Sequence, residues 1–201
     1  MDTFVQQLIN GLTIGAIYAL IALGYTMVYG IIELINFAHG DIFMLGAFAS
    51  VVFLGGILGQ NGGVHDLLFL ALLLIGTLAF TMPIIGLINV SIERAVYRPL
   101  RNAPRLAPLI TAIGVSFILQ NLALTVAGSG DRKAPQVFPL EWQIPFLGAS
   151  ISVLSIFIFG MAMALMLGLQ TFVNRTRMGR AMRATAQDRE ASSLMGVDLN
   201  Q

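Results

Sequence analysis

The 201-residue sequence contains no cysteine and only two histidines, His39 and His65. Without cysteine, disulfide frameworks, thiolate metal sites and cysteine nucleophiles are all excluded. The two histidines stand far apart, and neither has a second histidine or paired carboxylates at the spacing that metal ligands need. We therefore predict no metal site, no cofactor and no catalytic residue of these types.

The phosphate-binding pattern G-x-x-x-x-G-K-[ST] is also absent, because the only lysine, Lys133, is followed by alanine. This chain is therefore not expected to hydrolyse ATP. Serines such as Ser50, Ser116 and Ser155 lie inside apolar runs without a histidine nearby, so the machinery of nucleophilic catalysis is not visible. No enzyme function is predicted.

Charge is scarce and unevenly distributed. Charged residues make up 10% of the chain, against roughly 25% in soluble proteins. Hydrophobic residues make up 57%, and the mean hydropathy is +0.84. These values indicate a protein that lies in membrane lipid. The few basic residues form no groove or arm, so nucleic acid is not an expected partner.

Five long apolar runs indicate a polytopic bundle of membrane helices. The first run carries no charge and, at about 1.5 Å per residue, is long enough to cross a hydrocarbon core of roughly 30 Å. The third run includes Pro83, which is expected to kink its helix. We predict an all-α fold with spans over residues 8–32, 42–58, 67–91, 108–127 and 151–173.

The basic residues predict the orientation of the spans. Nine of the eleven lie in the loop 92–106 or from Arg175 onward, and Lys and Arg near span ends accumulate on the cytoplasmic side. Both segments are therefore predicted to be cytoplasmic, which places the loop 128–150 outside. Counting back puts the N-terminus outside too, unless the polar break at 33–41 makes an early element re-entrant.

The first span carries two patterns of its own. Small residues recur along one face at helical spacing, and such a stripe lets transmembrane helices approach closely. A tyrosine stripe runs beside it, which implies a packed bundle with a partly polar interior. The small stripe consists of Gly11, Gly15, Ala19 and Ala22, and the second stripe of Tyr18, Tyr25 and Tyr29.

The stretch "INFAHGDIFMLGAF" (35–48) holds the most polar groups of the first half. Asn36, His39 and Asp41 precede or open an apolar helix, and ionisable residues at membrane depth are functional candidates by default. One interpretation places these three residues in the transport pathway or its gate. The other is an interfacial turn, with Asp41 favourably placed near the N-terminus of the next helix.

The end of the chain differs from the rest, since the 26 residues from Thr176 hold seven charged residues while the first 92 hold four. Thr176 is a suitable N-cap for a helix that carries its polar residues at three- and four-residue intervals. That helix can extend from the fifth span into the cytoplasm. Its polar face is predicted to consist of Arg177, Arg180, Arg183 and Gln187.

A second short helix is predicted from Arg189 to Met195. Asp188 is a good N-cap, Glu190 suits the first turn, and Gly196 suits the C-terminal end. This helix would expose an apolar knob, formed by Ala191, Leu194 and Met195, outside the membrane. A helix lying on anionic lipid would need more lysine and a bulkier apolar face, so a protein partner is the better interpretation.

Three stretches resemble the branched-chain amino acid ABC-transporter permease family, and most closely the first of its two permease subunits. The coupling loop of ABC-importer permeases begins E-A-A-x-x-x-G, and this sequence has Glu190, Ala191, Ser192 and Gly196 at those positions. Serine replaces the second alanine. The family has further transmembrane helices after this loop, so we expect the chain to be incomplete at its C-terminus. The stretches are "GLTIGAIYALIALGYTMVYGIIELINFAHGDIFMLGAF" (11–48), "ERAVYRPLR" (93–101) and "GRAMRATAQDREASSLMGVD" (179–198).

The resemblance implies one transmembrane permease domain over 1–201, with a cytoplasmic coupling segment at 174–201. It implies a place in a bacterial inner membrane, beside a second permease subunit, two ATPase subunits and a periplasmic substrate-binding protein. The substrate would be leucine, isoleucine or valine. The residues implied in coupling to the ATPase subunit are Arg183, Ala184, Gln187, Asp188, Glu190, Ala191, Leu194, Met195 and Gly196.

Three other functions stay open at this stage. Permeases that resemble this one also carry urea and short amides. A secondary transporter or channel could bind a coupling ion at the break over 33–41, but it would not explain the coupling helix. A structural membrane scaffold would explain the apolar knob but would leave the polar groups of 36–41 unused.

Overall fold

The computed structural model describes residues 2–32, 36–60, 62–100, 103–104, 106–128, 130, 133–139, 141–146 and 149–197. Five helices are long and apolar enough to cross a membrane, which confirms the expected all-α polytopic fold. Large apolar side chains point outward along all five, as lipid-facing side chains do. The protein is a multi-pass membrane protein.

The five spans lie close to their predicted positions. The first is α1 (Asp2–Ile32), and the second is α2 (His39–Val51) continued by the π-helix η1 (Val52–Ile57). The third is α3 (Leu67–Ile92), with Pro83 inside it, and the fourth is α4 (Leu106–Ala127). The fifth is α5 (Val153–Arg175).

The third span differs from its prediction at the C-terminal end. Residues 92–106 were expected to form a loop, but the chain continues as the π-helix η2 (Glu93–Tyr97) and the 3₁₀-helix η3 (Arg98–Leu100). Four arginines and two prolines favoured a loop there. The helical backbone instead continues beyond the apolar run and includes the first charged residues that follow it. The predicted fold was right and this boundary was wrong.

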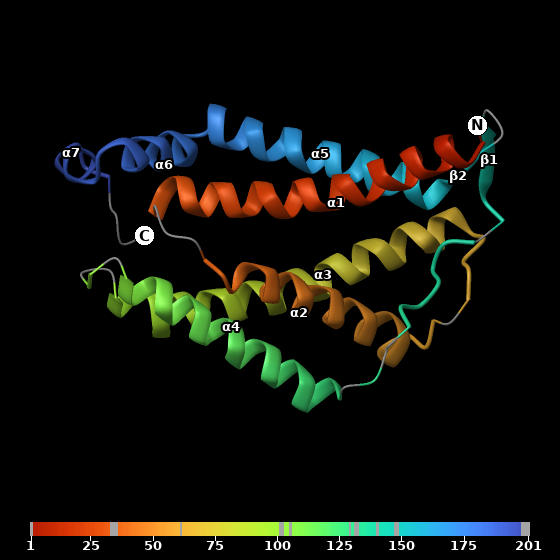
Figure 1. Ribbon diagram of the computed structural model, residues 1–201, viewed down its shortest axis with the longest axis horizontal. Coiled ribbons are helices and arrows are strands. Elements are labelled where there is room, and N and C mark those ends of the chain that lie inside the picture. The colour runs from red at the N-terminus through yellow and green to blue at the C-terminus, as the bar shows by residue number, and fades with distance from the viewer. Residues whose placement is uncertain are drawn as a thin grey trace. The chain divides into compact units, whose positions relative to one another are not determined.

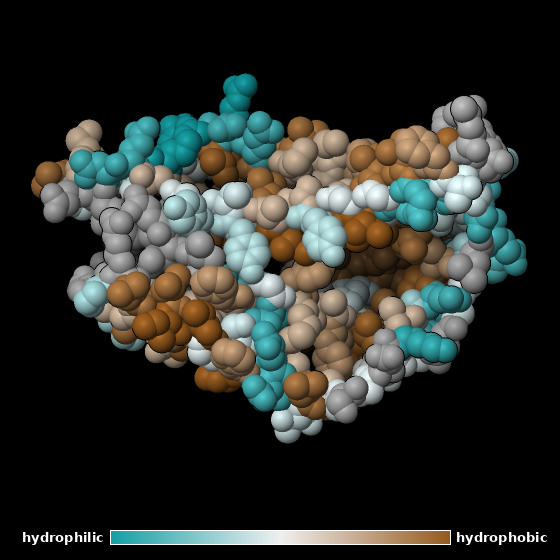
Figure 2. Space-filling view, viewed as in Figure 1, coloured by the Kyte–Doolittle hydropathy of each residue, from teal (hydrophilic) through white to brown (hydrophobic). Residues whose placement is uncertain are grey.

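The chain divides into two compact units, and each is described by itself. Unit 1 comprises residues 1–35 and 145–201, and unit 2 comprises residues 36–144. In unit 1, α5 packs against α1, and the short helices α6 (Arg177–Gln187) and α7 (Arg189–Leu194) follow α5 (Figure 1). Figure 2 shows hydrophilic residues gathered over α6 and the end of α5, beside the hydrophobic surface of the spans.

The small-residue stripe of α1 lies against α5, the element with which α1 packs most extensively. Gly11, Gly15 and Ala19 line an apolar groove of about 270 Å³, whose other wall includes Ala162 and Met166 of α5. A Cβ atom at Gly11 or Gly15 would meet no heavy atom within 4 Å. Helix α1 therefore packs along α5 as the stripe predicted, but at these two glycines the groove leaves space in place of a backbone contact.

Unit 2 is built on two small hydrophobic clusters. The first joins α2 to α4 through Ala38, Ile42, Val115 and Leu119. The second covers the start of α3, where Val64, Leu70 and Leu73 pack with Val137 of the loop before β1. Val64 N donates to Val137 O at 2.9 Å, so a backbone hydrogen bond also joins the loop before α3 to the loop before β1.

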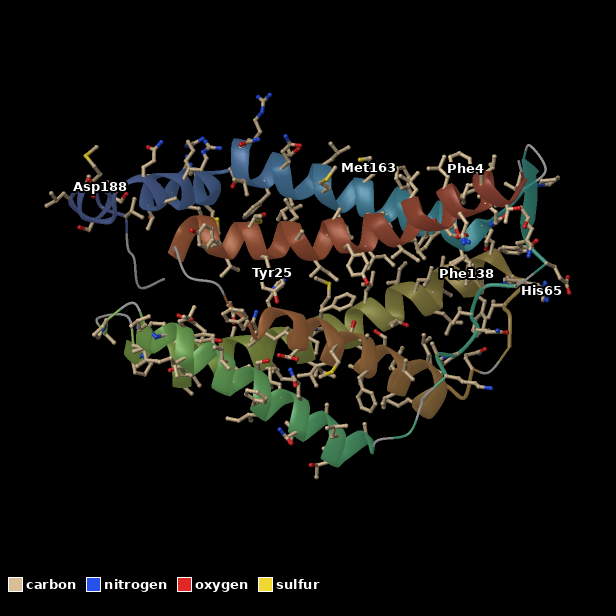
Figure 3. The ribbon with its side chains drawn as sticks, viewed as in Figure 1. Phe4, Tyr25, His65, Phe138, Met163 and Asp188 are labelled. Atoms are coloured by element: carbon tan, nitrogen blue, oxygen red, sulfur yellow. The ribbon has the colours of Figure 1, made fainter. Side chains whose placement is uncertain are left out.

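A short strand pair leads from the loop into the fifth span. Strand β1 (Gln143–Phe146) pairs with β2 (Ala149–Ser152) in a two-stranded sheet. Trp142, predicted to lie at the membrane interface, packs beside the second cluster, as does the labelled Phe138 (Figure 3). Ser152 then caps α5 by accepting a hydrogen bond from Leu154 N.

Candidate functional site

Asn36 lies in the turn that opens unit 2, immediately before α2. Its side-chain oxygen accepts from Ala38 N at 3.1 Å and from the Tyr97 hydroxyl at 2.8 Å. The first bond closes an Asx turn, and the second ties this turn to η2. His39 is the first residue of α2, is partly buried, and donates from its backbone N to Asn36 O at 3.1 Å.

Asp41 contacts a different helix. Its side chain is 9% exposed in the first turn of α2, where it accepts a hydrogen bond from Ser116 Oγ on one oxygen. Gln120 Nε2 donates to the other oxygen at 3.0 Å and to Ser116 Oγ at 3.1 Å. A carboxyl group in an apolar helix needs such donors, because burying it without partners is costly.

The three predicted pathway residues therefore lie on one segment but do not share one set of partners. Asn36 is bound to η2, whereas Asp41 is bound to α4. The interfacial interpretation was right about the position of Asp41 near a helix N-terminus, and it did not foresee the contact with α4. The structure leaves the pathway role itself as a prediction.

Sequence reasoning missed Tyr97, Ser116 and Gln120. Ser116 and Gln120 are four residues apart on α4 and so lie on one face of a helix. Two hydrogen-bonding side chains at that spacing inside a span were a usable signal. Tyr97 gave no such signal, because it belongs to a segment predicted to be loop.

The predicted coupling segment turns at a corner between α5 and α6. Thr176 has an extended backbone there, and its hydroxyl accepts from Gly179 N at 3.0 Å, which confirms the predicted N-cap. Gly179 is buried against the last turn of α5. A Cβ atom at this position would overlap the Val173 carbonyl and lie 2.6 Å from Val173 Cα. Only glycine therefore permits this approach.

Arg183 joins the same corner. Its Nη1 atom donates to Val173 O at 2.8 Å and to Asn174 Oδ1 at 2.9 Å. Carbonyl groups in the last turn of a helix lack intrahelical donors, and a cation there also complements the helix dipole. Arg183 was predicted to take part in coupling. In the structure its two hydrogen bonds hold α6 against the end of α5.

The short helix α7 begins as predicted. Asp188 caps it by accepting from Ala191 N at 3.0 Å, at the position labelled in Figure 3. Asp188 N in turn donates to Ala184 O at 3.0 Å, so Asp188 connects α6 to α7, directly after Gln187. The side chain of Glu190, another predicted coupling residue, lies outside the described side chains.

The C-terminal end of α7 has the geometry that its glycine predicted. Gly196 has a φ of 83°, Gly196 N donates to Ser193 O at 3.1 Å, and Val197 N donates to Ser192 O at 3.1 Å. These two bonds form a Schellman motif, in which glycine supplies the left-handed residue. Helix α7 ends at Leu194, one residue earlier than predicted, with Met195 as its C-cap.

The predicted apolar knob is present. Leu194 is 87% exposed and Met195 is 85% exposed, and Ala191 is exposed beside them. Ser192, at the position of the second alanine in the motif, is instead buried at 4% exposure, with its hydroxyl bound to Asp188 O at 2.6 Å. The serine therefore stabilises the turn without altering the exposed face.

Comparison with known proteins decides the family. The family described as "Branched-chain amino acid transport system / permease component" matches residues 7–201. The chain belongs to this family of permeases. The match begins within α1 and includes the other four spans and the short helices α6 and α7, so the resemblance seen in the sequence is confirmed.

Individual relatives of the permease family agree. The high-affinity branched-chain amino acid transport system permease protein BraD of Pseudomonas aeruginosa is 40% identical over 200 residues, covering 98% of this chain and 64% of the relative. The permease protein LivH of Escherichia coli is 41% identical over 198 residues, covering 97% of this chain and 63% of that protein. The chain thus spans just under two thirds of the length of these relatives. No solved structure was found to match.

Proposed function

We propose that this chain is the membrane-spanning permease subunit of an ATP-binding-cassette importer that moves leucine, isoleucine and valine into the cytoplasm. The observation that carries the proposal is the family match over residues 7–201, which extends without interruption through α6 and α7. The two relatives named above are both described as branched-chain amino acid permeases. The permease lies in a bacterial inner membrane.

The partners follow from the same proposal. A second permease subunit completes the pathway, a periplasmic binding protein delivers the substrate, and two ATPase subunits hydrolyse ATP. The exposed side chains of Leu194 and Met195 enter an apolar groove on an ATPase subunit, since so exposed an apolar pair beyond the spans needs a cover. Catalysis resides on the ATPase subunits and not on this chain.

The corner between α5 and α6 gives this contact a mechanical consequence. Thr176 and Arg183 bond α6 to the last turn of α5, and Gly179 packs on the same turn. Movement of α7 by a closing ATPase is thereby transmitted to a span instead of being absorbed by a flexible joint. The spans can then open the pathway to alternate sides of the membrane.

Uptake measurements test the substrate. Deleting the gene for this chain in its source organism is expected to abolish high-affinity uptake of radiolabelled leucine, isoleucine and valine, and the wild-type gene should restore it. Labelled urea and acetamide serve as controls, and their uptake should not change. Loss of urea or acetamide uptake with normal leucine uptake would favour the short-amide alternative. Normal uptake of all five compounds would contradict the importer proposal.

Thiol labelling tests the orientation, and the native absence of cysteine leaves each introduced thiol alone. Arg98→Cys and Arg180→Cys are expected to resist a membrane-impermeant reagent in intact cells, because both lie in the predicted cytoplasmic segments. Gln136→Cys should react. All three native side chains are exposed, so burial does not bias the comparison. Labelling of Arg180→Cys from outside would invert the topology and remove α7 from the ATPase side.

A further inference from the structure

The cluster formed by Asp41, Ser116 and Gln120 joins the first turn of α2 to the middle of α4. Helix α4 has 22 residues, and Ser116 is ten residues beyond its first residue, Leu106. At about 1.5 Å per residue this is roughly 15 Å along the helix, which is half the thickness of a hydrocarbon core of roughly 30 Å. Since Ser116 bonds Asp41, the carboxyl group contacts α4 near the middle of that helix, while Asp41 itself stands in the first turn of α2.

The hydrogen bonds of the cluster suit an ionised carboxylate. Both oxygens of Asp41 accept, one from a hydroxyl and one from an amide. Ser116 and Gln120 are neutral, so they orient the carboxylate without cancelling its charge. A carboxylate has about four lone-pair sites, and these two bonds leave about half of them for another donor. A cationic donor would satisfy both the remaining sites and the charge.

The cluster borders the surface of unit 2 on one side and aliphatic residues on the other. Gln120 is exposed and Ser116 partly buried on α4, so the two donors lie between the surface of unit 2 and the buried Asp41 carboxylate. Ile42, Val115 and Leu119, which adjoin the polar residues along the two helices, form the aliphatic cluster between α2 and α4. Figure 2 shows hydrophilic residues among hydrophobic ones over α2 and α4, and the cluster combines one negative group with aliphatic surroundings.

We propose that the Asp41 carboxylate, held by Ser116 and Gln120, binds the ammonium group of the amino acid during its passage. This inference rests on the proposed function and names the group of the substrate that the permease recognises. A primary ammonium supplies a positive charge and three N–H donors, which a carboxylate with free lone pairs accepts. A metal ion fits less well, because no group of three or more His, Cys, Asp or Glu among the described residues could hold one.

Substitutions separate recognition from structural support. Asp41→Asn keeps the shape and an acceptor for Ser116 but removes the charge. Its leucine uptake per molecule of permease should fall about tenfold or more, at unchanged membrane abundance and thermal stability. Ser116→Ala, the matched variant, removes a donor while keeping the charge, and should reduce uptake by less than about threefold. Asp41→Glu should recover part of the uptake lost in Asp41→Asn.

Ligand protection tests binding directly. Leu45 packs beside the aliphatic cluster one turn after Asp41, so Leu45→Cys places a single thiol near the carboxylate. In membranes containing the complete complex, leucine and leucinamide, which both carry an ammonium, should slow modification of this thiol by a small reagent. The analogue 4-methylpentanoate lacks the ammonium and should not. Adding Asp41→Asn should abolish protection by leucine.

The outcomes of these experiments distinguish an ammonium site from structural support alone. Equal protection by leucine and 4-methylpentanoate, protection that survives Asp41→Asn, or a thiol that never reacts would each overturn the ammonium site. So would parallel losses of abundance in Asp41→Asn and Ser116→Ala with normal uptake per molecule, because these indicate structural support alone. In each of these cases wild-type leucine uptake leaves the importer proposal intact. A wild-type complex that transports no leucine overturns both the ammonium site and the importer proposal.

Discussion

Replacing Gly179 with alanine is expected to abolish leucine uptake and to destabilise the permease by about 3 kcal/mol. The added Cβ would overlap the Val173 carbonyl and lie 2.6 Å from Val173 Cα, and neither backbone atom can turn aside as a flexible side chain can. The corner must therefore open, which also separates Arg183 from its acceptors on α5. Thermal unfolding of the purified protein and uptake in cells measure the two effects.

A second glycine provides the control. Gly168 lies in α5, and a Cβ there would meet no heavy atom within 4 Å. Gly168→Ala should leave uptake and unfolding temperature unchanged or slightly raise the temperature, because alanine is the better helix former. If Gly179→Ala behaves like Gly168→Ala, then α6 does not pack on α5 as closely as described.

Leu194→Asp is expected to detach the ATPase subunit while leaving the permease folded. The side chain is 87% exposed, so a charge there disturbs nothing within the described chain. In the complex it would meet an apolar groove, where a buried contact is commonly worth about 2 kcal/mol, and binding should weaken roughly 30-fold. Retention of the ATPase subunit on the affinity-tagged permease, and substrate-stimulated ATP hydrolysis, measure the loss.

Leu194→Met is the matched variant, since it keeps an apolar side chain of similar volume. It should retain the ATPase subunit at close to the wild-type level. Wild-type retention and stimulation in Leu194→Asp would remove α7 from the proposed contact. It would leave the family assignment untouched, because that assignment rests on the whole chain.

The parts of the candidate site that the sequence predicted are those governed by neighbours in the chain. Thr176 and Asp188 cap helices through amides three residues ahead. At the end of α7, Gly196 N bonds the carbonyl three positions back and Val197 N bonds the carbonyl five positions back. Such interactions are contained within one or two turns, so composition and spacing are enough to predict them. The five spans were predictable for a similar reason, because length and hydropathy decide them.

The contacts that the sequence did not predict join distant residues. Asp41 and Ser116 are 75 positions apart, and Asn36 and Tyr97 are 61 apart. Which polar side chains meet across two helices depends on their rotation and register, and neither is encoded within a single span. The approach of Gly179 to Val173 was missed for a related reason, since it depends on the angle at Thr176. The exposed arginines of α6 gave no sign that Arg183 would turn back to α5.

The corner at Thr176 determines how far a movement of α7 displaces the far end of α5. Helix α6 has 11 residues and α5 has 23, so at about 1.5 Å per residue their lengths are roughly 16 Å and 34 Å. If the fastened pair pivots as one body about the corner, it acts as a lever with an arm ratio of about two. A shift of roughly 2 Å at α7 then becomes about 4 Å at the far end of α5. A small stroke by the ATPase would thus be amplified in proportion to the lengths of the two helices.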